Sequence, residues 1–258
     1  MTYQVDAAVA TITLNRPDAM NSLTTEVKES LLAVVRRAAE DPQVRCVVLT
    51  GTGRAFCVGQ DLKEHVENLR SGSEELFRTV PEHYNPLVHT LATMDKPVVA
   101  AVNGVAAGAG ASLAFACDFR VLADTAGFNL AFTGIALSCD TGSSWSLPRL
   151  VGRAKALELL YFPRTVGAEE ARDLGLATTV VPAADLADEV RELAMRLAAG
   201  PTLAFGAVRR SVTHAAGHDL DDALAFEAQM MARTGDTHDH HTAVQSFLAK
   251  EKPTFEGR

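Results

Sequence analysis

Apolar and polar positions along the first two thirds of the chain follow two periods, one typical of strands and one typical of helices. Residues 9–14 alternate between apolar and polar side chains, as a strand with one buried face does. Residues 44–49 and 98–102 are continuous apolar runs, which favour buried strands. The pattern predicts strands at residues 9–14, 44–49, 98–102, 119–122 and 178–181.

Between and after these strands, apolar residues recur at helical spacing. Val27, Leu31, Val34 and Val35 share one face of a helix that the Asp-Pro pair at residues 41–42 ends. Further helices are predicted from about residue 62, over 108–117 and 154–160, from about 168, and over 188–199, 201–215 and 221–231. We therefore expect an α/β core over residues 1–187 and a helical region over residues 188–258. The irregular spacing of the strand-loop-helix units favours a coiled stack of turns over a doubly wound sheet.

Composition narrows the class of protein without naming a function. The chain has 258 residues, of which 47% are hydrophobic and 22% charged, and a formal net charge of −8. These values are typical of a globular domain with a sizeable core, and an acidic chain has no basic field to hold nucleic acid. The first residues have neither the positive flank nor the apolar core of a signal peptide, and no apolar stretch reaches the length of a membrane span. We expect a cytoplasmic protein with no membrane or nucleic-acid partner.

Residue types that bind metals do not form a recognisable pattern. Cys46, Cys57, Cys117 and Cys139 have no CxxC spacing, so they are expected to be reduced thiols without zinc. Residues 238–241, His-Asp-His-His, lie near a predicted helix start, where a solvated face is the favoured interpretation.

Two short segments of small residues are the best candidates for chemistry. Residues 57–61 (Cys-Val-Gly-Gln-Asp) and 108–110 (Gly-Ala-Gly) each lie a few residues beyond a predicted buried strand. Small side chains let backbone amides approach a ligand closely, and amides from two loops can converge on one developing oxyanion. The pair predicts an oxyanion hole. A dinucleotide site is disfavoured because Leu113 stands where that motif needs a glycine, and residues 110–114 lack the second glycine of a nucleophile elbow.

Several longer motifs occur in order along the chain. They are residues 14–17 (LNRP), 20–23 (MNSL), 54–62 (RAFCVGQDL), 96–104 (KPVVAAVNG), 117–120 (CDFR), 147–152 (LPRLVG) and 247–258. Together they resemble the motifs of the crotonase superfamily, also called the enoyl-CoA hydratase/isomerase family, nearly from end to end. The resemblance implies a spiral of repeated β-β-α turns with a C-terminal helical region, and an enzyme of acyl-CoA and fatty acid metabolism.

The resemblance also implies roles for particular positions. The backbone N–H groups of Val58 and Ala109 would bind the thioester oxygen of an acyl-CoA, with the N-terminus of the helix near Gly108 pointing at it. Residues expected to contact the coenzyme A part are Arg16, Met20 and Asp61, completed by Phe247 and Lys250 near the C-terminus, in some relatives from a neighbouring subunit. Gly59 and Gln60 are expected to contact the acyl-CoA substrate. Coenzyme A is then part of the substrate, no metal or other cofactor is implied, and a homotrimer or homohexamer is expected.

The chain departs from the hydratase pattern at its acids. Hydratases of this family use two glutamates, but Ser112 and Phe132 stand at the matching positions, and neither can activate water. Asp140 lies nearby in sequence and resembles the single acid/base of epoxyphenylacetyl-CoA isomerases and some enoyl-CoA isomerases. One carboxylate suffices to move a double bond. An isomerase is therefore the leading hypothesis; a hydratase, a dehalogenase with Asp140 as nucleophile, and a catalytically silent CoA-binding homologue are the alternatives.

Overall fold

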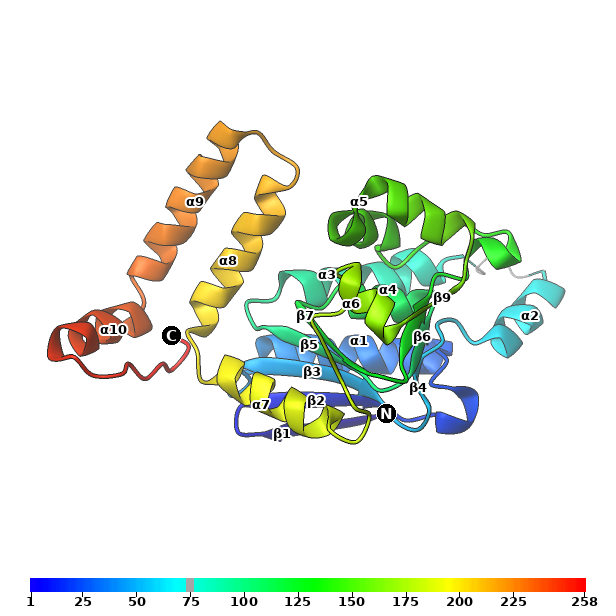
Figure 1. Cartoon of the computed structure of the whole chain (residues 1–258), viewed down its shortest axis with the longest axis horizontal. Helices are drawn as coiled ribbons and strands as arrows, with labels where there is room; N and C mark the ends of the chain where they lie inside the picture. The colour runs from blue at the N-terminus through cyan, green and yellow to red at the C-terminus, as the bar shows by residue number, and fades with distance from the viewer. Residues whose placement is uncertain (73–76) are drawn as a thin grey trace.

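Two β-sheets form the core of the computed structural model, which describes residues 1–72 and 77–258 (Figure 1). The larger sheet contains β1 (Thr2–Asp6), β2 (Val9–Leu14), β3 (Cys46–Gly51), β5 (Val98–Val102), β7 (Phe119–Ala123) and β10 (Thr179–Val181), in that order. The smaller sheet contains β4 (Ala55–Cys57), β6 (Val105–Ala107), β8 (Gly127–Asn129) and β9 (Thr165–Gly167). The strands from β2 to β10 in the larger sheet are parallel, and β1 is antiparallel to β2.

The chain contributes to both sheets in each turn of the fold. β3 and β4 lead into α2 (Leu62–Arg70), and β5 and β6 lead into α4 (Ala109–Phe115). β7 and β8 then lead into α5 (Ser143–Tyr161), and β9 leads into α6 (Ala168–Asp173). Because β3, β5 and β7 are neighbours in one sheet and β4, β6 and β8 in the other, these turns stack on one another. The predicted α/β spiral of β-β-α turns is confirmed.

Helix α1 (Thr25–Glu40) packs on the core with a face that differs in part from the one predicted from the sequence. Its buried residues are Lys28, Leu31, Leu32, Val35 and Ala38, whereas the predicted members Val27 and Val34 are only half-buried. The buried stripe thus begins with a lysine. The remaining short elements are α3 (Asn85–Thr93) and the single turns η1 (Pro17–Ala19), η2 (Val80–Tyr84) and η3 (Thr133–Ile135).

The C-terminal helices divide into one that packs on the larger sheet and three that extend from it. α7 (Leu186–Ala198), which the sequence assigned to the helical region, lies against β3, β5 and β7. α8 (Thr202–Ala215) and α9 (Leu220–Gly235) form a helical hairpin that leads away from the sheets to α10 (His238–Ala249) (Figure 1). In the described part of the chain, no helix combines the length and apolar character that a membrane span needs.

Side-chain hydrogen bonds join this extension to the core. Arg209 on α8 pairs with Asp118 beside β7. Arg45 donates hydrogen bonds to the carbonyl oxygens of Phe255 at 2.6 Å and Gly200 at 2.5 Å. The orientation of the helical hairpin is therefore fixed by half-buried charged groups as well as by apolar packing.

Candidate active site

The two small-residue loops lie in direct contact with each other. A Cβ atom on Gly110 would lie 2.1 Å from the carbonyl oxygen of Cys57, which is closer than any side chain allows. A Cβ atom on Gly59 would lie 3.0 Å from the amide nitrogen of Ala109, and Gly59 also has a φ of +80°. Glycine at both positions is therefore what lets the two backbones approach each other.

The two predicted oxyanion donors differ in their present partners. Ala109 is the first residue of α4, so its N–H group belongs to the helix terminus that has no acceptor within the helix. The Val58 N–H donates a 3.3 Å hydrogen bond to the carbonyl oxygen of Met20. At that length the bond is weak, so a bound oxyanion can compete for the Val58 amide. Met20 is held in the left-handed region, with a φ of 49°.

Ser112 and Phe132, the two positions that the resemblance matches to hydratase acids, both make packing contacts. Ser112 is fully buried in α4, and its Oγ lies 3.0 Å from the carbonyl oxygen of Gly108 and 2.5 Å from Oγ of Ser143. The Phe132 ring is buried beside the oxyanion turn, with Cε1 4.0 Å from the Cβ position of Gly108. Ser112 thus ties α4 to the start of α5, and the Phe132 ring covers the turn. Neither side chain contains a group that could activate water.

Asp140 lies in the loop that precedes α5 and is half-buried. Its Oδ1 accepts a 2.7 Å hydrogen bond from the hydroxyl of Thr141, and its carbonyl oxygen accepts one from the amide of Ser143. Burial raises the pKa of Asp140, and the Thr141 hydrogen bond and the charge of Lys28 oppose that rise in part. A carboxylate with a raised pKa is a stronger base than an exposed one, which suits proton transfer from carbon.

Asp140 faces a small cavity with mainly apolar walls, which we call the acyl cavity. It is lined by Gln60, Leu62, His65, Phe77, Thr79, Val80, Tyr84, Ile135, Leu137 and Asp140. Of these described residues, Asp140 alone carries a carboxylate. Because Gln60 follows Val58 by two residues, the cavity adjoins the loop of the predicted oxyanion hole.

The sequence pattern missed three side chains at this cavity or behind it. Tyr84 and His65 line the cavity, and Lys28 donates a hydrogen bond to Gln60 from behind its wall. Lys28 could have been found, because it occupies the same apolar stripe of α1 as Leu31 and Leu32. A lysine at a core position of an amphipathic helix needs a buried partner. The sequence gives no corresponding signal for Tyr84.

Arg16 and Asp61, both predicted to contact coenzyme A, are bonded to each other. Arg16 Nη1 donates to Asp61 Oδ2 at 3.0 Å, and Ser22 Oγ donates to the same oxygen at 2.9 Å. The other carboxylate oxygen caps α2 by accepting from the amides of Lys63 and Glu64. Burial alone would raise the pKa of Asp61, but these hydrogen bonds together lower it below its usual value. Asp61 therefore has a structural role, and its contact with coenzyme A stays a prediction.

Within one chain, Phe247 and Lys250 are not brought to the other site residues. Both lie at the end of α10, which Figure 1 shows at the opposite end of the molecule from α2. Phe247 is 81% exposed, and Lys250 ends the helix in the left-handed conformation. A second chain would have to supply these two residues to a site that contains Val58 and Ala109.

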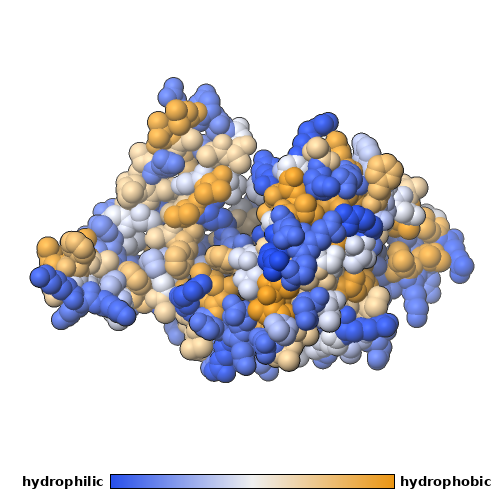
Figure 2. Space-filling model, viewed as in Figure 1, coloured by the Kyte–Doolittle hydropathy of each residue, from blue (hydrophilic) through white to orange (hydrophobic). Residues whose placement is uncertain are grey.

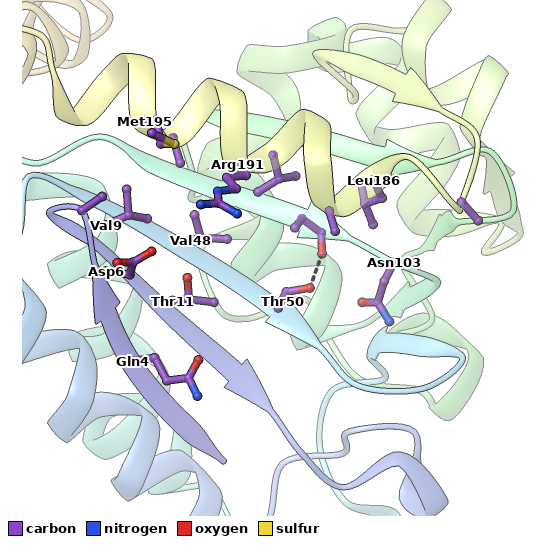
Figure 3. Close-up of a pocket in the computed structure, with 16 residues that line it drawn as sticks. Gln4, Asp6, Val9, Thr11, Val48, Thr50, Asn103, Leu186, Arg191 and Met195 are labelled. Carbon is purple, nitrogen blue, oxygen red and sulfur yellow. Dashed lines mark hydrogen bonds between the residues drawn. The ribbon is translucent and has the colours of Figure 1, made fainter.

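A separate cleft lies between the larger sheet and α7 (Figure 3). It has a volume of about 530 Å³, and its polar side chains include Asp6, Thr11, Asn103 and Arg191. Thr50 Oγ1, on the cleft wall, donates a hydrogen bond to the carbonyl oxygen of Ala101. None of the predicted site residues lines this cleft, so it is distinct from the acyl cavity.

Comparison with known proteins shows the family of the chain. The profile of the enoyl-CoA hydratase/isomerase family matches residues 4–258. The chain belongs to this family. It is 39% identical over 254 residues to the 1,2-epoxyphenylacetyl-CoA isomerase of Escherichia coli K12, covering 98% of this chain and 97% of the relative. A probable enoyl-CoA hydratase of Rhodobacter capsulatus is 42% identical over 257 residues, covering 99% and 97%.

A solved structure confirms the crotonase fold. The crystal structure of a putative enoyl-CoA hydratase/isomerase from Mycobacterium abscessus superposes with a TM-score of 0.95 at 44% identity, covering 100% of this chain and 99% of that one. Family membership identifies the protein as an enzyme of the enoyl-CoA hydratase/isomerase type that acts on acyl-CoA thioesters.

Proposed function

We propose that the protein is an acyl-CoA isomerase that moves a double bond, with Asp140 as the acid/base. The observation that carries this proposal is the set of acids at the site. Asp140 is the one carboxylate among the described residues that line the acyl cavity, while Ser112 and Phe132 occupy the hydratase acid positions. A relative named 1,2-epoxyphenylacetyl-CoA isomerase supports the same choice.

The proposed mechanism uses the two halves of the site together. The thioester oxygen accepts hydrogen bonds from the Val58 and Ala109 amides, with the Val58 N–H leaving its 3.3 Å contact to Met20. Asp140 takes a proton from one carbon of the acyl chain, and the negative charge delocalises onto the thioester oxygen. The same carboxyl group then returns the proton to another carbon of the dienolate. No water is consumed, so one acid/base is enough.

Hydration is the second candidate because a probable enoyl-CoA hydratase is 42% identical to the chain. Hydration requires a group that positions and deprotonates a water molecule. The side chains of Ser112 and Phe132 cannot do so, and Asp140 would have to perform both steps. Dehalogenation with Asp140 as nucleophile and a silent CoA-binding homologue are the remaining alternatives.

The direct test is turnover of a panel of 2-enoyl-, 3-enoyl- and aryl-CoA thioesters, with products identified by mass and double-bond position. The proposal predicts a product of unchanged mass with a shifted double bond. A product heavier by one water would favour the hydratase, loss of halide from a halogenated aryl-CoA would favour the dehalogenase, and binding without turnover of any member would favour the silent homologue.

We further propose that the active form is a homotrimer or homohexamer in which α10 of one chain approaches the site of another. Apolar side chains gather on the arm formed by α8 and α9 (Figure 2). Those more than half exposed on the three C-terminal helices are Val208, Val212, Leu220, Leu224, Met231, Phe247 and Leu248. Burying such side chains against another copy is favourable. Sedimentation should show a trimer or larger assembly at micromolar concentration, and a compact monomer would contradict this proposal.

Two further expectations complete the proposal. Because coenzyme A is part of the substrate and the proposed chemistry is proton transfer, activity should survive exhaustive chelation and need no redox cofactor. The cytoplasm is the proposed location of the protein. Loss of activity on chelation, restored by a specific divalent ion, would overturn the first expectation.

A further inference from the structure

A buried lysine lies behind the wall of the acyl cavity. Lys28 on α1 is 1% exposed, and its Nζ donates hydrogen bonds to Oε1 of Gln60 at 3.0 Å and Oγ1 of Thr79 at 2.6 Å. Both partners are neutral, and both line the cavity. Nζ also lies 5.4 Å from the centroid of the Tyr84 ring. Burying an ammonium group is costly unless its donors are hydrogen-bonded, so the bonds to Gln60 and Thr79 stabilise Lys28 at this buried position.

These contacts fix the orientation of the Gln60 amide. An ammonium group has donors and no acceptor, so the Gln60 atom that faces Lys28 is the oxygen. The Tyr84 hydroxyl donates to the same oxygen at 2.8 Å. With Oε1 held between Lys28 and Tyr84, Nε2 and its two N–H groups point away from both. Nε2 makes no hydrogen bond to any residue that the structure describes.

The backbone of Gln60 is fixed as firmly as its side chain. Residues 59–61 form a bridge with Leu23, in which the Leu23 amide donates to Gly59 at 2.8 Å and the Asp61 amide donates to Leu23 at 3.1 Å. Gln60 therefore presents its amide from a rigid position, on the same cavity wall as Tyr84 and two residues from the oxyanion donor Val58. Rigid donors of this kind are typical of groups that select a ligand.

We propose that Gln60 is a specificity residue whose Nε2 donates a hydrogen bond to an oxygen atom carried by the acyl group of the substrate. Lys28 is the positioning residue that bonds Oε1 and so leaves Nε2 available to a ligand. The substrate class is an acyl-CoA with an ether, epoxide or hydroxyl oxygen close to the carbons that Asp140 serves. This inference rests on the proposed acyl-CoA site and names the kind of acyl group that the site selects.

The test compares binding of acyl-CoA pairs that differ by one oxygen, so it does not depend on turnover. Each pair consists of a saturated acyl-CoA or phenylacetyl-CoA and its analogue with an ether or hydroxyl oxygen at C2, C3 or C4. Dissociation constants are measured by calorimetry. For at least one pair, the wild-type protein should bind the oxygenated ligand about fivefold or more tightly, as one added neutral hydrogen bond predicts.

Gln60→Glu is the matched variant. It keeps the shape of the side chain and an acceptor for both Lys28 and Tyr84, but it replaces the Nε2 donor by an acceptor. Its added charge affects both members of a pair alike, so it cancels in the ratio of affinities. The preference for the oxygenated ligand should disappear or reverse in this variant. A wild-type ratio in Gln60→Glu, or no preference for any oxygenated ligand in the wild type, would overturn the proposal.

Lys28 is tested through the same ratio. In Lys28→Met the amide can turn, so the preference should fall toward that of Gln60→Glu, and Lys28→Arg should restore it because a guanidinium also donates to Oε1. A folded Lys28→Met protein with the wild-type ratio would remove Lys28 from the proposal. If no panel member is isomerised but the ratio behaves as described, the mechanism with Asp140 fails and the specificity role of Gln60 stands.

Discussion

The two halves of the candidate site consist of different chemical groups, backbone amides in one and side chains in the other. The oxyanion half consists of backbone amides from two loops that touch at Gly59 and Gly110. The acyl half consists of side chains, among them Asp140, Gln60 and Tyr84, that come from separate parts of the chain. Substitutions can therefore alter the acyl half one group at a time, while the oxyanion half tolerates little change.

The largest effect is expected where the oxyanion half is broken. In Gly110→Ala the new Cβ would collide with the backbone of Cys57, so the two loops must separate. We expect destabilisation by about 1–3 kcal/mol, as for other overpacked sites. Turnover should fall about a thousandfold, because both amides lose their alignment. Thermal unfolding and steady-state kinetics measure the two effects.

Gly217→Ala is the matched control for this change, because a Cβ at that position meets nothing within 4 Å. It should leave both stability and turnover near the wild-type values. A Gly110→Ala protein as active as Gly217→Ala would show that close contact of the loops is unnecessary.

The acyl half should respond to pH and to the charge of Lys28. Asp140 must be ionised to accept a proton, and burial raises its pKa, so kcat/KM should fall on acidification at a higher pH than an exposed aspartate would give. The charge of Lys28 lowers the pKa of Asp140, so Lys28→Met should move this acidic limb to higher pH. Lys28→Arg keeps the charge and should leave the limb near its wild-type position. If the acidic limb does not move in Lys28→Met, the charge of Lys28 does not lower the pKa of Asp140.

The smallest expected effect concerns the ion pair between Arg16 and Asp61, which lies at the end of the loop formed by residues 57–61. Asp61→Asn keeps the cap of α2 but removes the charge, so we expect a loss of about 1 kcal/mol in unfolding free energy near neutral pH. The lowered pKa of Asp61 means that its contribution is present above the unfolded pKa and is lost as the pH falls through the folded pKa. The two unfolding free energies should therefore converge in acid. A difference that is constant with pH would contradict this origin.

The sequence pattern indicated the two small-residue loops, which the structure brings into contact, more readily than it indicated the side chains of the acyl cavity, for a physical reason. Short glycine-containing motifs after apolar strands are local patterns, and the residues 57–61 and 108–110 were found that way. Long buried strands such as β2 and β5 were predicted with their observed limits. The acyl half depends instead on tertiary contacts, such as that between Lys28 and Gln60, which no local pattern encodes.

Short elements were also beyond prediction. The strands of the smaller sheet, such as β4 and β6, have three residues each and are too brief to show a period. Helix α5 was predicted only from residue 154, because Pro148 and the kink at Gly152 interrupt its pattern. That helix carries the loop of Asp140 at its start, so the resemblance to a family, and not periodicity, identified this residue.

The central claim is that Asp140 moves the proton, and exchange of substrate hydrogen with deuterated solvent tests it most directly. A substrate that the wild-type protein isomerises is incubated in deuterated water with wild type, Asp140→Asn and Ser112→Ala, and deuterium at the α- and γ-carbons and the rate of turnover are measured. We predict that Asp140→Asn loses exchange or transfer between these carbons and about a hundredfold or more in turnover, with acyl-CoA affinity little changed. Ser112→Ala should be much milder, since the hydroxyl bonds to Gly108 and Ser143 and has no role in the proposed proton transfer. Full exchange and turnover in Asp140→Asn would contradict the mechanism.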